Sequence, residues 1–278
     1  MFELISQLFS YTFIIRALVV GILVSLCAAL LGVTLVLKRY SMIGDGLSHV
    51  SFGALAIAMA LNLAPLEVAI PVVTIAAFGL LRISENSRIK GDAAIALISS
   101  SALAIGVIVI SLTTGMNTDV CNYLFGSILA MSKNDVYLSV AVSAVVLMLY
   151  LLLYNKIFAV TFDESFARAT GVKAGRYNTL IAVLTALTIV IGMRMMGAML
   201  ISSLIIFPAL TSMRVCKSFR AVVVSSALLS VVCFFIGIFL SFVYSIPAGA
   251  GVVAVNLTAF CLFALLGRLI KRRREDTV

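Results

Sequence analysis

The amino-acid sequence predicts an all-α membrane protein, a polytopic transmembrane helical bundle of about nine spans, with eight as the alternative. Hydrophobic residues make up 63% of the chain, whereas soluble domains contain about half. The mean hydropathy is +1.22. The longest run without a charged residue, 221–267, has 47 residues, which is enough for two crossings of about 20 residues each. We therefore expect a single transmembrane domain over residues 1–278.

Charged residues and turn residues divide the apolar sequence into the individual spans. Pro71 interrupts the third span, and proline and glycine at 245–249 separate the last two. The boundary between the sixth and seventh spans falls near Met196 and Gly197. The expected spans are 12–37, 41–62, 64–82, 91–113, 134–155, 175–196, 197–215, 218–245 and 247–269.

Lysine and arginine are concentrated in alternate loops, and this distribution predicts the orientation of the chain. With the C-terminus in the cytoplasm and the N-terminus outside, 17 of the 20 basic residues fall on the cytoplasmic side. Arg194 lies near the outer end of its span, where it could snorkel to the interface or take part in a gate. The net charge of +9 is thus explained by topology and requires no nucleic-acid partner.

Asp45 and His49 are the candidate metal ligands. His49 is the only histidine in the chain, and two helical residues four apart lie on one face with their Cβ atoms about 6 Å apart. One carboxylate and one imidazole suit zinc, manganese or ferrous iron better than calcium or magnesium. The alternative is structural, with Asp45 as a helix cap and His49 as a satisfied polar residue. Ionisable groups inside a membrane span favour the functional interpretation.

Recognised hydrolase and nucleotide-binding motifs are absent from the sequence. It contains no G-x-x-x-x-G-K-[ST] phosphate loop, no H-E-x-x-H and no G-x-S-x-G. The five cysteines form no C-x-x-C pair, so neither a disulfide framework nor a thiolate metal site is expected. We conclude that this polypeptide is not an enzyme and does not hydrolyse nucleotides by itself.

Two further segments carry candidate gate or entrance residues. Residues 117–131 are too short and too interrupted to cross the membrane, and we expect a short helix at the outer surface. Asp119 in this segment either caps that helix or draws cations to an entrance. Pro208 lies in the middle of the seventh span, where it frees a backbone carbonyl that protein or a water-lined cavity must satisfy.

The longest cytoplasmic loop, 156–176, contains a predicted short helix. Thr161 and Glu164 have the spacing of a capping box, and Gly171 stands where the helix would end. Phe162, Phe166 and Ala169 would then share one face. Because so short a helix is marginal in water, it must pack on the membrane surface or on a partner protein.

The chain resembles the membrane-spanning permease subunits of bacterial ABC importers for divalent metal ions, the zinc, manganese and iron permeases. It is most similar to the zinc members. The resemblance extends over nearly the whole length and rests on four stretches in the family order. They are 36–51, which includes Gly-Asp-Gly-Leu-Ser-His, then 123–130, 166–172, and 190–211 with its Gly-Ala-Met-Leu-Ile-Ser-Ser pattern.

The resemblance implies partners and roles. It implies a homodimer in the bacterial cytoplasmic membrane, two cytoplasmic ABC ATPase subunits and an extracytoplasmic metal-binding protein that delivers the ion. Asp45 and His49 would line the permeation route, and 161–171 would be the coupling helix that docks on the ATPase. No covalently bound cofactor is expected, and the metal is cargo: Zn²⁺, or else Mn²⁺ or Fe²⁺. The implied coupling residues are Thr161, Glu164, Phe166, Ala167 and Gly171.

Three other functions are less consistent with the sequence. A metal-chelate permease for a siderophore or haem would leave the Asp45–His49 pair without a role. An intramembrane metalloenzyme would need a further base or nucleophile. A passive channel would not need the capped cytoplasmic helix. An ATP-driven zinc importer therefore remains the leading hypothesis.

Overall fold

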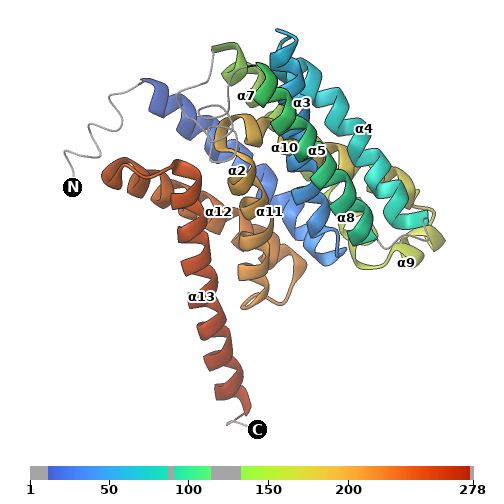
Figure 1. The fold of residues 1–278 in the computed structure, drawn as a ribbon. Coiled ribbons are helices and arrows are strands. Elements are labelled where there is room, and N and C mark those ends of the chain that lie inside the picture. The colour runs from blue at the N-terminus through green and yellow to red at the C-terminus, as the bar shows by residue number, and fades with distance from the viewer. Residues whose placement is uncertain (1–11, 87–90, 114–132, 276–278) are drawn as a thin grey trace.

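The computed structural model describes residues 12–86, 91–113 and 133–275, and this part of the chain is entirely helical (Figure 1). Apolar side chains dominate every long segment, and in a bilayer a helix satisfies all of its own backbone hydrogen bonds. The helices are α2 (Thr12–Leu37), α3 (Ser41–Ala60), α4 (Pro65–Asn86), α5 (Gly91–Thr113), α7 (Lys133–Leu152), α8 (Tyr154–Phe162), α9 (Glu164–Ala169), α10 (Ala174–Met196), α11 (Ala198–Met213), α12 (Phe219–Tyr244) and α13 (Ala248–Glu275).

Eight of the described helices are long and apolar enough to cross a membrane. Each of the nine expected spans forms a helix, but the one expected at 197–215 is the 16-residue α11. At 1.5 Å per residue α11 is about 24 Å long, which is shorter than the hydrocarbon core of about 30 Å. The break before α11 occurs at Gly197, whose φ of 83° is readily adopted only by glycine. The described residues thus contain eight long spans, the alternative that the sequence allowed, and a ninth, shorter apolar helix.

Helices α2, α3 and α10 form the centre of the bundle. Within the most apolar window of each, 72% of the residues are buried, compared with 22% for α5, α7 and α13. Close approach of the central helices depends on small residues. Gly32 of α2, for example, lies directly against the backbone of Ile205 in α11, so that a side chain at this position would collide with it.

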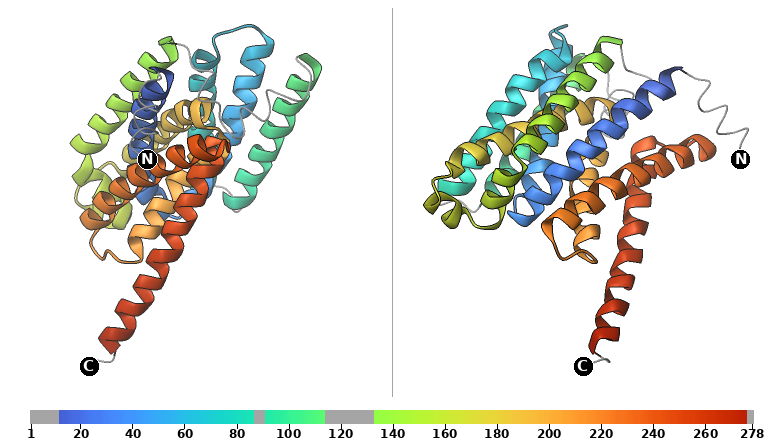
Figure 2. Two further views of the ribbon diagram at one scale, coloured as in Figure 1. Left: turned by 90° about the vertical axis from the view of Figure 1, so that its left-hand side faces the viewer. Right: turned by 180° about the vertical axis from the view of Figure 1, so that it is seen from behind.

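The basic turns share one end of the bundle. Figures 1 and 2 show the α2–α3 turn, the α8–α9 segment and the α11–α12 turn at the same end, opposite the α3–α4 turn. The last turns of α13 extend beyond the rest of the bundle (Figure 2). This arrangement matches the alternation of loops predicted from hydropathy.

Candidate functional site

Helix α3 carries Asp45 and His49 through the middle of the protein. It packs on α4, α5, α10 and α11, and glycine makes the contact with α5 possible. A Cβ on Gly46 would lie 2.7 Å from Ile95 Cγ2, and one on Gly53 would lie 2.7 Å from the backbone oxygen of Ala102. The glycines thus bury one side of α3, whereas Asp45 and His49 lie on a side that is only partly covered.

Asp45 and His49 point toward each other across one helical turn. His49 Nε2 lies 3.7 Å from Asp45 Oδ2. The side chain of His49 exposes 24% of its surface, and that of Asp45 exposes 42%. Two ligand atoms about 2.0–2.2 Å from one tetrahedral ion are about 3.4 Å apart. The observed separation is therefore too long for a hydrogen bond but close to what a shared ion requires. The two side chains thus lie one turn apart on the same face of the helix, as the spacing predicted.

The depth of the pair follows from helix geometry. At 1.5 Å per residue, Asp45 lies about 6 Å and His49 about 12 Å from Ser41 along a helix about 30 Å long. His49 is thus close to the midpoint of α3. Among the described residues, no group of three or more His, Cys, Asp or Glu side chains is placed to hold a metal ion. Within that part of the chain, the site offers two such protein ligands.

Several polar atoms around the pair are buried. Ser48 donates a hydrogen bond from Oγ to the backbone oxygen of Asp45 at 2.7 Å, and Ser202 of α11 donates to Ser48 Oγ at 3.4 Å. His49 Nδ1 and Ser51 Oγ are buried without a hydrogen-bond partner in the described part of the chain. Leaving such groups unpaired costs about 1–3 kcal/mol each.

The two candidate gate or entrance residues that the structure describes, Arg194 and Pro208, do not join this pair. Arg194, in the last turn of α10, lies 3.6 Å from the Asp135 carboxylate at the start of α7. Pro208 is buried within α11. Asp119 and the predicted helix at 117–131 lie outside the described residues. The observed partner of Arg194 indicates a contact between α7 and α10, which hydropathy could not reveal.

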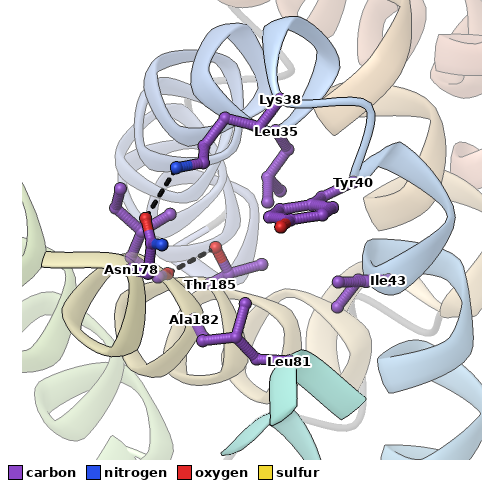
Figure 3. A pocket seen from close by; sticks show the side chains of 9 residues that line it. Leu35, Lys38, Tyr40, Ile43, Leu81, Asn178, Ala182 and Thr185 are labelled. Atoms are coloured by element: carbon purple, nitrogen blue, oxygen red, sulfur yellow. Dashed lines mark hydrogen bonds between the residues drawn. The ribbon is translucent and has the colours of Figure 1, made fainter. Parts of the chain in front are cut away.

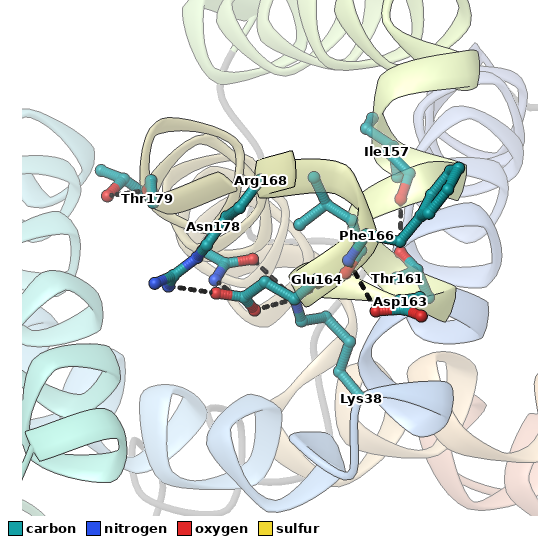
Figure 4. Close-up of polar contacts among 11 residues, drawn as sticks. Lys38, Ile157, Thr161, Asp163, Glu164, Phe166, Arg168, Asn178 and Thr179 are labelled. Atoms are coloured by element: carbon teal, nitrogen blue, oxygen red, sulfur yellow. Dashed lines mark hydrogen bonds and ion pairs between the residues drawn. The ribbon is translucent and has the colours of Figure 1, made fainter. Parts of the chain in front are cut away.

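The predicted coupling helix begins later than expected. Thr161 is not its N-cap, because the hydroxyl donates to the backbone oxygen of Ile157 within α8 at 2.6 Å. Asp163 is the cap instead: its backbone is extended, and its carboxylate accepts a hydrogen bond from the backbone N–H of Phe166 at 2.9 Å (Figure 4). The expected helix over 161–171 is thus two helices, α8 and α9, joined at Asp163. Threonine and aspartate both cap helices, and the capping-box spacing of Thr161 and Glu164 led to the wrong one of the two.

The end of α9 agrees with the prediction. Gly171 has a φ of 84°, its N–H bonds the oxygen of Arg168, and the N–H of Val172 bonds the oxygen of Ala167. This is the Schellman arrangement, which favours glycine at that position.

The apolar residues of this segment separate into an outer and an inner set. Phe162 and Phe166 expose 61% and 64% of their surface, whereas Ala167 is fully buried against Val160 and Ala174. Ala167 therefore supports the fold of the segment and is not available to a partner. Of the predicted coupling residues, Phe166 is the one whose side chain is presented outward to the greatest extent.

Glu164 is the centre of a polar cluster rather than part of a capping box. Its carboxylate accepts hydrogen bonds from Lys38, Arg168 and Asn178 (Figure 4). Partial burial by itself raises the pKa of Glu164, but the hydrogen bonds from Asn178 and Arg168 and the charge of Lys38 hold the pKa below its ordinary value. Glu164 is therefore ionised at neutral pH. No local pattern in the sequence predicts this cluster, because its members come from α9, α10 and the residue that follows α2.

A small cavity lies beside the same cluster, among α2, α3, α4 and α10 (Figure 3). Its volume is about 10 Å³, roughly that of one water molecule. Lys38 and Asn178 form its polar edge, and Tyr40 and Ile43 contribute the beginning of α3. The cavity adjoins the turn that leads into the Asp45–His49 helix.

Comparison with known proteins adds three relatives. Residues 10–267 match the profile of the ABC 3 transport family. The chain is 30% identical to the manganese import system permease protein ScaB of Streptococcus gordonii, with 98% of both sequences covered. It is 30% identical to the high-affinity zinc uptake system membrane protein ZnuB of Haemophilus influenzae, covering 93% of this chain and 97% of that protein. The solved structure of PsaBC from Streptococcus pneumoniae in complex with Fab contains a chain of 31% identity and a TM-score of 0.84, with 94% of both chains covered.

Proposed function

This chain belongs to the ABC 3 transport family, as the transmembrane permease of an ATP-driven manganese or zinc importer, and we propose that Asp45 and His49 bind the ion on its way across. It is a multi-pass protein of the cell membrane. As in other ABC permeases, the ATPase is a separate subunit, so this polypeptide is a transporter component and not an enzyme.

The separation of 3.7 Å between His49 Nε2 and Asp45 Oδ2 carries the proposal. A carboxylate and an imidazole approach each other without forming a hydrogen bond, on a partly open side of a central helix. An ion between them would neutralise the Asp45 charge and use a ring nitrogen that faces the same space. A stable structural site would be expected to supply four protein ligands, whereas a transport site must also release its ion. Two ligands, completed by water or by a second copy of the chain, support transient binding.

The proposed assembly is a homodimer with two cytoplasmic ABC ATPase subunits and an extracytoplasmic protein that delivers the metal. We place the α8–α9 segment on the cytoplasmic side, because the basic turns gather at that end of the bundle (Figure 1). Phe166 and Phe162 are exposed there, and aromatic side chains of this kind are typical of docking surfaces. We propose that this surface couples the permease to the ATPase.

Zinc is the proposed cargo, and manganese is the alternative. Imidazole is a favoured ligand of zinc, whereas manganese is well served by oxygen ligands alone. The relatives bear names of both kinds, manganese for ScaB and zinc for ZnuB. The contribution of the His49 nitrogen to uptake therefore discriminates between the two ions.

Radiometal uptake into proteoliposomes that contain the full complex tests the site. Asp45→Asn removes a charge and should abolish uptake of either ion, and His49→Ala should do the same for zinc. Asp92→Asn is the matched control, because Asp92 is an exposed aspartate in the first turn of α5. Wild-type uptake in both the Asp45 and His49 variants would refute the proposed site.

The metal is identified with a third variant. His49→Asp replaces the nitrogen with an oxygen ligand. Zinc transport should then fall much more than manganese transport if zinc is the natural cargo. Equal loss of both ions, or retention of zinc uptake, would contradict the preference for zinc.

A further inference from the structure

Lys38 is a nearly buried cation that the ion pathway described above does not use. Its side chain exposes 7% of its surface. The ammonium donates hydrogen bonds to Asn178 Oδ1 at 2.6 Å, to the backbone oxygen of Val160 at 3.1 Å and to Glu164 Oε2 at 3.3 Å. A lysine ammonium has three N–H donors, and all three are satisfied here. Burial of such a group is tolerated only with this degree of pairing.

The three acceptors come from three different elements. Val160 belongs to the last turn of α8. Glu164 is the first residue of α9, and Asn178 lies in the second turn of α10 (Figure 4). One ammonium thus joins both sides of the α8–α9 junction to α10. Any displacement of α9 relative to α10 must break or move at least one of these hydrogen bonds.

The backbone beyond Lys38 leads directly into the metal-site helix. Arg39 follows in the left-handed region, at a φ of 61°, and Tyr40 precedes the first residue of α3. The turn is tight, since the N–H of Tyr40 bonds the oxygen of Leu35 at 2.7 Å. Few free torsions therefore separate Lys38 from Asp45, which lies in the second turn of α3. A shift of the Lys38 backbone would be transmitted to the start of α3.

We propose that Lys38 is a positioning residue that couples movement of the α8–α9 segment to the helix that carries Asp45 and His49. This inference rests on the proposed function, in which α8–α9 docks on the ATPase and α3 holds the ion. The ion pair with Glu164 connects Lys38 to α9, and the hydrogen bond to Asn178 connects it to α10. Because its side chain exposes only 7% of its surface and is bonded to α8, α9 and α10, Lys38 acts through those helices and not as a ligand of the ion. Replacing Lys38 should therefore change the number of metal ions transported for each ATP hydrolysed.

The test uses the complete importer in proteoliposomes, with permease, ATPase and metal-loaded delivery protein. Lys38→Met keeps the length of the side chain and removes the charge. We expect the complex to assemble, and the metal ions taken up per ATP hydrolysed to fall about fivefold or more, the lower end of typical coupling between sites. Lys38→Arg keeps the positive charge and should restore most of the wild-type ratio of metal ions to ATP. Arg39→Gln, which removes the adjacent exposed cation, is the matched control and should leave it unchanged.

Glu164→Gln provides an independent variant if Lys38→Met does not fold. It removes the charge from the α9 side of the link while keeping an acceptor oxygen, and it should also lower the ratio. An unchanged ratio in either folded variant would overturn the inference. Failure of the wild-type complex to take up manganese or zinc would instead refute the proposed function, so the two failures are distinguishable.

Discussion

Phe166 provides the most direct test of the docking surface. The side chain exposes 64% of its surface in the free permease. Full burial of a phenylalanine side chain contributes about 1.5–3 kcal/mol, so the exposed part represents about 1–2 kcal/mol that docking could recover. Phe166→Ala should therefore weaken association with the ATPase about five- to thirty-fold, since 1.4 kcal/mol corresponds to a factor of ten.

The dissociation constant is measured by titrating purified ATPase onto the permease held in lipid nanodiscs. Phe166→Ala should leave the thermal unfolding midpoint of the permease unchanged, because the side chain is exposed. Ala167→Asp is the informative contrast: Ala167 is fully buried, and placing a carboxylate there should destabilise the segment by several kcal/mol. Unchanged affinity of Phe166→Ala, with the fold intact, would refute the assignment of this face.

Two further predictions concern packing and topology. Gly53→Ala places a methyl group 2.7 Å from a backbone oxygen of α5 and should destabilise the protein by about 1–3 kcal/mol. Gly79→Ala lies inside α4 with nothing within 4 Å of the added Cβ and should stabilise the protein by about 0.5–1 kcal/mol, because alanine favours a helix over glycine. Equal unfolding midpoints of the two variants would contradict the close approach of α3 and α5. In a background with the native cysteines replaced by serine, Asn62→Cys should react with an impermeant thiol reagent added outside, and Lys217→Cys should not. The reverse labelling would overturn the orientation and with it the cytoplasmic placement of α8–α9.

Much of the fold could be predicted from the sequence because the signals that define it are local. Hydropathy located the long helices of the described residues to within about six residues at each end, and the break at Gly197 was expected from the residues around it. The Asp45–His49 juxtaposition follows from the period of the α-helix alone. Four motifs in order identified the family. None of these inferences required knowledge of which helix packs against which.

Tertiary structure decided the rest, because it depends on contacts between residues far apart in the chain. The sequence analysis predicted Thr161 as the cap of the coupling helix, but the structure places Thr161 inside α8 and makes Asp163 the cap. Within the same segment, Ala167 faces inward and Phe166 outward. Lys38 and Asn178 are separated by 140 positions, and no pattern in the sequence indicates that their side chains meet. Their hydrogen bond exists because α2 ends beside the beginning of α10, an arrangement fixed by the burial of apolar faces throughout the bundle.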